Sequence, residues 1–96
     1  MVTREAIRQK RDAILEIARR YGAHDIRIFG SVARGDVTES SDLDLLVRFD
    51  PDRSLFDQGG MVMDLRDLLG LKVDVVSEGA LQGLFGEIVS SEAVPL

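Results

Sequence analysis

Hydrophobic residues recur with two different periods along the chain, and the change of period divides it into predicted helices and strands. Over residues 4–21, apolar side chains repeat every three or four positions, which predicts an amphipathic helix with Thr3 as N-cap and Gly22 after its last turn. A second helix is expected over residues 55–69, where the glycine pair 59–60 should interrupt its first part. The residues expected on its inner face are Leu55, Val62, Leu65 and Leu69.

Three shorter apolar runs are typical of β-strands, namely residues 25–29, 42–49 and 71–76. A short helical turn starting at Ser31 and a polar loop over residues 35–41 separate the first two strands. A last helical region is predicted over about 80–91, with apolar residues at helical spacing. The tail, residues 92–96, either adds a short edge strand or packs on a partner.

This order of elements, α-β-α-β-α-β-α, predicts an α/β (α+β) fold in which a small mixed β-sheet is flanked by helices. The pattern leaves the order and direction of the strands open. With 96 residues and 45% apolar residues, the chain is expected to form a single domain over residues 1–96.

Charge and composition narrow the function. The net charge of −5 argues against binding a long nucleic acid, which usually requires a basic face. No apolar run approaches the roughly 20 residues of a membrane span, and no signal peptide is recognisable, so a soluble cytoplasmic protein is expected. The absence of cysteine excludes disulfides and thiolate zinc sites.

Three aspartates lie inside the two most apolar predicted strands, although aspartate is a poor strand residue. Asp42 and Asp44 are two positions apart, so their side chains share one face of a strand at a separation of about 6.5–7 Å. Carboxylates at this spacing suit one Mg²⁺ ion or a pair of ions on a nucleotide. Asp74 on the next strand is the candidate third carboxylate.

The other half of the candidate site is Gly30-Ser31, where a strand runs into a helical turn. Such a junction presents backbone N–H groups and a hydroxyl to an anion such as phosphate. An ordinary turn with Ser31 as N-cap is the alternative. The P-loop pattern is absent.

Together these residues resemble the DNA polymerase β-like nucleotidyltransferase superfamily. The matching pattern is Gly30-Ser31, then ten residues, then Asp42-Leu43-Asp44, with Asp74 on a later strand. Within that superfamily the chain is similar to the minimal nucleotidyltransferases (MNT) of prokaryotic toxin–antitoxin pairs, and the similarity covers nearly the whole chain.

The resemblance implies a role for each residue. ATP is the implied substrate, with its triphosphate held by Gly30 and Ser31. The implied Mg²⁺ ligands, for two ions, are Asp42, Asp44 and Asp74, the last also assisting the acceptor hydroxyl. Two loop residues, Arg34 and Ser41, are implied to contact phosphate, although a cap or loop hydrogen bond explains each equally well.

The resemblance also implies a partner. Similar MNT proteins pair with HEPN-domain RNase toxins, which they are thought to silence by transferring AMP from ATP to a tyrosine hydroxyl. Two alternatives are a non-catalytic antitoxin that acts by complex formation and, less favoured, a nucleotidyltransferase for small molecules such as antibiotics. Because the predicted core takes up the 96 residues, a docked partner or a second subunit, in a homodimer or hetero-oligomer, is expected to complete the acceptor side.

Overall fold

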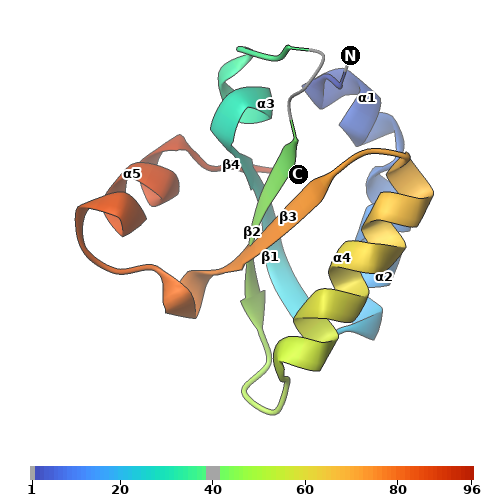
Figure 1. The fold of residues 1–96 in the computed structure, drawn as a ribbon, viewed down its shortest axis with the longest axis vertical. Coiled ribbons are helices and arrows are strands. Elements are labelled where there is room, and N and C mark those ends of the chain that lie inside the picture. The colour runs from blue at the N-terminus through green and yellow to red at the C-terminus, as the bar shows by residue number, and fades with distance from the viewer. Residues whose placement is uncertain (1, 39–41) are drawn as a thin grey trace.

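A four-stranded mixed sheet forms the centre of the computed structural model, which describes residues 2–38 and 42–96. The strands lie in the order β3-β2-β1-β4 (Figure 1). Strand β2 is antiparallel to β1 and parallel to β3, and β4 is antiparallel to β1. The strand bounds are Ala23–Phe29 (β1), Leu43–Phe49 (β2), Val73–Ser77 (β3) and Val94–Pro95 (β4). The predicted class, a small mixed sheet flanked by helices, is confirmed.

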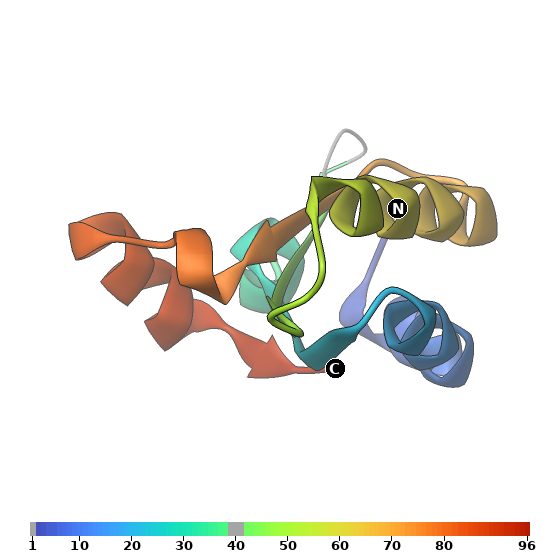
Figure 2. The ribbon, with the colours of Figure 1, turned by 90° about the horizontal axis from the view of Figure 1, so that it is seen from below.

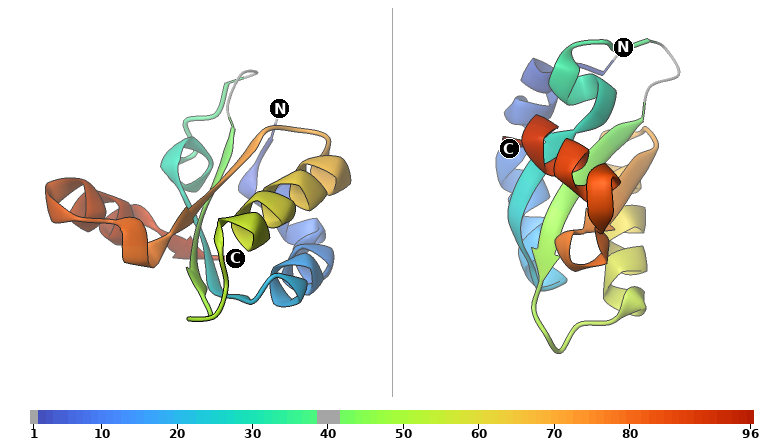
Figure 3. Two further views of the ribbon diagram at one scale, coloured as in Figure 1. Left: turned by 60° about the horizontal axis from the view of Figure 1, so that its bottom comes forward. Right: turned by 90° about the vertical axis from the view of Figure 1, so that its left-hand side faces the viewer.

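Helices cover both sides of this sheet. Figures 2 and 3 show α1, α2 and α4 on one side, whereas α3, α5 and the 3₁₀ turn η1 lie on the other. Their bounds are Arg4–Gln9 (α1), Arg11–Arg20 (α2), Gly30–Arg34 (α3), Leu55–Leu69 (α4), Glu78–Ala80 (η1) and Gly83–Glu92 (α5). In the part of the chain that the structure describes, no helix is long and apolar enough to cross a membrane.

The single helix predicted over residues 4–21 is two helices that meet at Lys10. The backbone of Lys10, at φ −104° and ψ 14°, departs from helical values, and its N–H donates to the Ile7 carbonyl at 3.0 Å. The break allows each helix its own approach to the sheet, so that both Ile7 and Ile14 are fully buried. An amphipathic period alone does not reveal such a change of axis.

Alternation along β2 divides the core into two parts. Leu43, Leu45 and Val47 are buried in the main core together with residues of α1, α2 and α4. Leu46 points to the other side, where it packs with Phe29 and with Val89 of α5. The central strand is therefore covered on both faces, which explains why its apolar residues are nearly continuous.

Helix α4 is continuous, so the predicted interruption at Gly59-Gly60 is wrong. Gly60 faces the ring of Tyr21, where a Cβ atom would lie 2.6 Å from Cε1, and the Tyr21 hydroxyl donates to Asp64 at 2.6 Å. The glycine is thus needed for the close contact between α2 and α4. Leu55, expected inside, is 82% exposed in the first turn of the helix.

The last predicted helix, 80–91, is replaced by η1 and α5, which together start earlier and end one residue later. Gly86 of α5 is buried against Leu81. The contact is so close that an added Cβ atom on Gly86 would lie only 3.2 Å from the Leu81 Cβ. The tail forms the edge strand β4, and the N–H of Leu96 donates to the Ile26 carbonyl at 3.0 Å. Of the two alternatives for the tail, the edge strand is the one observed.

Candidate active site

The strand register brings two of the three predicted aspartates side by side. Asp44 and Asp74 are each the second residue of their strand, and they are paired across the parallel strands β2 and β3. Neighbouring strands lie about 4.8 Å apart, so both carboxylates leave the sheet from adjacent positions on one face. On the other side of Asp44, its register partner in β1 is Phe29. Asp42 directly precedes β2, two residues before Asp44.

This arrangement strongly perturbs Asp44. Its pKa is raised to about 6, first because burial penalises the charged carboxylate, and then because of the negative charges of Asp74 and Asp42. Arg34 opposes this shift, since its positive charge lowers the pKa of Asp44. Three carboxylates whose charges repel one another are costly to hold together unless a cation neutralises them.

Gly30 lies directly against Asp44. It begins α3 with φ +73°, and a Cβ atom there would collide with the Asp44 carboxylate, lying 3.2 Å from its Cγ. The sequence predicts that this glycine allows phosphate to come close to the backbone. The structure adds a second requirement, because only glycine leaves room for the carboxylate and also tolerates the left-handed backbone.

Ser31 is the second residue of α3, and the N-cap of that helix is Phe29. The alternative role of Ser31 as N-cap is therefore wrong. Its side chain is half-buried beside Gly30, and its carbonyl accepts the N–H of Asp36 at 3.0 Å. The hydroxyl thus lies at the strand-to-helix junction where the sequence placed it.

Arg34 belongs to the last turn of α3, which is the short helical turn predicted to start at Ser31, and it directly precedes the polar loop. Its guanidinium pairs with Asp36 at 3.2 Å and with Glu92 of α5 at 3.1 Å, and these carboxylates raise its pKa. The pairing with Glu92, distant in sequence, could not be predicted from local pattern. Ser41, the remaining predicted contact, lies outside the described residues.

The donor set of the aspartates fits Mg²⁺, which prefers oxygen ligands and usually takes one or two carboxylates plus water and substrate phosphates. Within residues 2–38 and 42–96, no three acidic or imidazole side chains converge into a ready-made metal cage. The paired Asp44 and Asp74, with Asp42 two residues away, could therefore hold an ion that takes its remaining ligands from water or phosphate.

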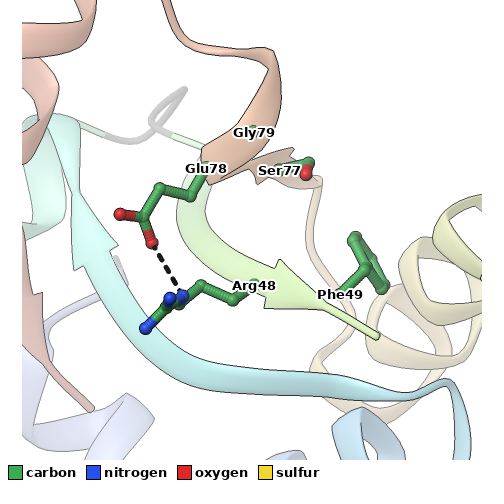
Figure 4. Close-up of a pocket in the computed structure, with 5 residues that line it drawn as sticks. All are labelled: Arg48, Phe49, Ser77, Glu78 and Gly79. Carbon is green, nitrogen blue, oxygen red and sulfur yellow. Dashed lines mark ion pairs between the residues drawn. The ribbon is translucent and has the colours of Figure 1, made fainter. Parts of the chain in front are cut away.

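A separate cleft of about 460 Å³ lies at the other end of the same two strands (Figure 4). It is lined by Arg48, Phe49, Ser77, Glu78 and Gly79. Asp44 and Arg48 are four residues apart on β2, or about 13 Å. Since Arg48 pairs with Glu78 at 3.5 Å and with Asp25 at 3.4 Å, the charges here are mutually compensated. The cleft is not part of the aspartate site.

Comparison with known proteins agrees with this arrangement. The chain belongs to the nucleotidyltransferase domain family, which it matches over residues 8–94. Protein adenylyltransferase MntA of Thermococcus cleftensis is 38% identical to it over 79 residues, which cover 82% of this chain and 80% of that protein. These matches make the protein a nucleotidyltransferase.

Solved structures match as well. One described as a minimal nucleotidyltransferase is 46% identical, with a TM-score of 0.88, and the match covers 99% of this chain and 97% of the other. A more distant one, a crystal structure of a toxin–antitoxin with AMP-PNP, is 20% identical with a TM-score of 0.75, covers 88% of this chain and 69% of that chain, and shares the fold. The resemblance to minimal nucleotidyltransferases expected from the sequence is confirmed.

Proposed function

We propose that the protein is an antitoxin that transfers AMP from ATP to a tyrosine hydroxyl of a HEPN-type RNase toxin. The observation that carries the proposal is the pairing of Asp44 with Asp74 on neighbouring strands. Asp42 is two residues before Asp44, and Gly30 packs against the Asp44 carboxylate. The name of the Thermococcus cleftensis relative, a protein adenylyltransferase, supports a protein acceptor. The crystal structure of a toxin–antitoxin with AMP-PNP supports a nucleotide and a toxin in this context.

In the proposed reaction, the phenolic oxygen of the acceptor forms a bond to the α-phosphorus of ATP. The bond from that phosphorus to the oxygen of the departing pyrophosphate breaks, and pyrophosphate leaves with the electron pair. The phenolic proton passes to a carboxylate, and Asp74, which is exposed, would accept it. AMP then remains on the tyrosine.

The chain's own residues would position the reactants. Asp42 and Asp44 would hold Mg²⁺, which supplies positive charge to the triphosphate and the leaving pyrophosphate. Gly30 and Ser31 would approach the phosphates at the junction of β1 and α3. Arg34, close enough to lower the pKa of Asp44, would add a positive charge to the same region.

Labelling tests this function directly. The purified protein is incubated with the purified product of the adjacent reading frame, labelled ATP and Mg²⁺, and modified peptides are identified by mass spectrometry. We expect one AMP on a tyrosine of the partner, and no label with the double variant Asp42→Asn, Asp44→Asn. Absence of label with ATP and with the other nucleoside triphosphates would contradict the proposal.

A non-catalytic antitoxin that acts by complex formation is the second candidate. The observation that favours it is the set of exposed apolar side chains on α5, where Leu84 is 71% and Phe85 64% exposed. Toxicity in cells separates the two candidates. If the double aspartate variant, at normal expression, protects cells as well as the wild type does, binding alone is sufficient.

A further inference from the structure

Helix α5 carries an apolar surface that its own chain leaves uncovered. Only Gly86 and Val89 of its ten residues are buried. On the outward side, Leu84 is 71%, Phe85 64% and Ile88 47% exposed, and we call these three residues the α5 patch. Ile88 is four residues after Leu84 and three after Phe85, so it lies beside both of them on the helix surface. A helix that exposes more large apolar side chains than it buries typically forms part of a binding surface.

This patch lies on an element that borders the aspartate site. Glu92 of α5 pairs with Arg34 of α3, the short helix that begins at Gly30. The buried side of α5 places Val89 against Phe29, and Phe29 is the register partner of Asp44. Figure 3 shows α5 beside α3 on the same side of the sheet, in agreement with these contacts. A protein held by α5 would thus lie on the side of the sheet from which the carboxylates project.

The ionisable side chains of α5 itself, Glu87 and Glu92, are both acidic, and Glu92 is paired with Arg34. Residues 73–96 contain four acidic residues and no lysine, arginine or histidine. Glu87, exposed on α5, is three residues after Leu84 and therefore borders the patch beside that residue. Because an acidic border favours a basic one on the partner, the complementary surface is apolar at its centre and carries lysine or arginine at its edge.

We propose that the α5 patch is the docking surface for the protein that receives AMP, and that this partner presents an apolar patch bordered by basic residues. The inference rests on the proposed function and adds to it the surface that holds the acceptor. Burial of Phe85 and its neighbours would supply the anchor, as large aromatic side chains do in the centres of interfaces. Docking here would hold the acceptor on the side of the sheet that carries Asp44 and Asp74.

A second exposed apolar group, on α4, serves as a comparison. Phe56 and Met63 are 92% and 67% exposed, but α4 lies on the opposite side of the sheet from α5 (Figure 2). The charges near them are of both signs, with Arg66 and Asp67 on the same helix. An acceptor held on α4 would have the sheet between itself and the carboxylates, so this surface does not explain transfer.

Kinetics of AMP transfer test the inference, with the purified product of the adjacent reading frame as acceptor. The variant Leu84→Ser, Phe85→Ser is compared with the matched control Phe56→Ser, Met63→Ser. We expect the α5 variant to raise the KM for the acceptor at least tenfold, with unchanged kcat and ATP affinity. The α4 control should leave all three constants within about twofold of the wild type. An unchanged acceptor KM in the α5 variant would overturn the inference.

A charge reversal provides a second variant that changes no apolar contact. Glu87→Lys should raise the acceptor KM and should remove most of its dependence on salt concentration, since exposed charges act through a screened field. Circular dichroism of each variant checks that it folds. Acceptor binding that responds neither to Glu87→Lys nor to the α5 double variant would place docking elsewhere.

Two further results separate the inference from the proposed function. If the wild-type protein transfers AMP but the α5 variant does so with the same acceptor KM, the docking surface is wrong and the function stands. If the wild type transfers nothing, calorimetric titration with the same partner still decides whether α5 binds it. A dimer in sedimentation that the α5 variant converts to monomers, with acceptor KM unchanged, would show that a second copy covers the patch.

Discussion

The two ends of strand β2 carry charged side chains on the same face of the sheet. At one end these charges are paired with charges of opposite sign, and at the other end negative charge is in excess. At the far end, Arg48 pairs with both Asp25 and Glu78, and Glu78 also pairs with Arg27 at 2.7 Å. At the near end, Asp44 and Asp74 are paired in register, with Asp42 two residues away, and the charge of Arg34 opposes theirs only in part, since the pKa of Asp44 stays raised to about 6. The far end, which we call the compensated end, is a structural network, whereas the near end, which we call the uncompensated end, keeps an excess of negative charge that would suit a cation.

Backbone detail supports the same contrast. At the far end, a shift of register between His24 and Arg27, with Asp25 at φ +57°, redirects β1 so that Asp25 reaches Arg48. At the near end, the irregular residue is Gly30, which leaves room for Asp44. The irregularity at Asp25 thus supplies an ion-pair partner for Arg48, whereas the irregularity at Gly30 leaves space for the carboxylate of Asp44.

The largest expected effect comes from neutralising the uncompensated end. Asp44→Asn should reduce AMP transfer by roughly 10²–10³-fold or more, because a preorganised electrostatic group for the transition state is lost. Arg48→Gln, a matched change at the compensated end, should leave the rate within about threefold. Initial rates of AMP transfer measure both. Equal losses in the two variants would remove the functional contrast between the ends.

The next largest effect tests whether the free space between Gly30 and Asp44 is needed for AMP transfer. Gly30→Ala and Gly35→Ala both place a Cβ on a left-handed backbone, at φ +73° and +79°, and each should cost about 1–2 kcal/mol of stability. Only the Cβ at position 30 meets a side chain, since position 35 has open space around it. We therefore expect Gly30→Ala to reduce transfer at least tenfold more than Gly35→Ala. Urea unfolding and initial rates separate strain from displacement of the carboxylate.

The raised pKa of Asp44 predicts how stability depends on pH in the absence of metal. Its pKa is about 6 in the folded protein and about 3.9 in the unfolded chain, so the folded state binds the extra proton between these values. The stabilisation from the protonated form is complete below pH 4 and is lost as the pH rises through 6. Asp44→Asn should therefore be more stable than the wild type at pH 7.5, by roughly 1 kcal/mol after allowance for solvent screening.

Thermal unfolding in EDTA at several pH values measures this difference. The advantage of Asp44→Asn should shrink below pH 6 and disappear near pH 4, where the wild-type carboxyl is protonated. Added Mg²⁺ should reduce the advantage at pH 7.5, since only the wild type gains the ion's charge. A pH-independent advantage would mean that the substitution acts through packing and not through repulsion among the carboxylates.

The smallest expected effect belongs to the compensated end. Arg48 is exposed, and exposed ion pairs contribute at most about 1 kcal/mol. Arg48→Gln should thus change the free energy of unfolding by about 0.5 kcal/mol or less in denaturant titration. A loss above about 1.5 kcal/mol would show that its pairs with Asp25 and Glu78 stabilise the sheet more than exposed pairs do.

Sequence pattern predicted well what depends on short-range periodicity. Alternation predicted that Asp44 and Asp74 each lie on the face of their own strand opposite to its buried neighbours, and the burial of these strands agrees. Their direct pairing depends on the parallel arrangement of those strands, which no local pattern contains. The contact of Gly30 with Asp44 and the pair of Arg34 with Glu92 depend on the same long-range placement, and so they could be seen only in the structure.

The pattern was wrong where tertiary contacts override local preference. The Gly59-Gly60 pair favours a break, yet packing of Tyr21 against Gly60 and the cap formed by Ser54 and Asp57 hold α4 continuous. Leu55 fits the apolar period of the same helix but is exposed in its first turn. A helical period identifies apolar positions without telling which of them the neighbouring elements cover.

The position of β4 at the edge of the sheet affects which part of the protein unfolds locally first. It follows α5 directly and joins the sheet only through β1, where Val94 is opposite Ile28 and Pro95 opposite Arg27. Contacts between segments so distant in sequence form late in folding, since a long loop must close first. We expect β4 and α5 to form one unit of low local stability, whose amides exchange with solvent before those of β1 and β2. A docked partner would then also slow exchange in this unit, by supplying the cover that the chain itself lacks.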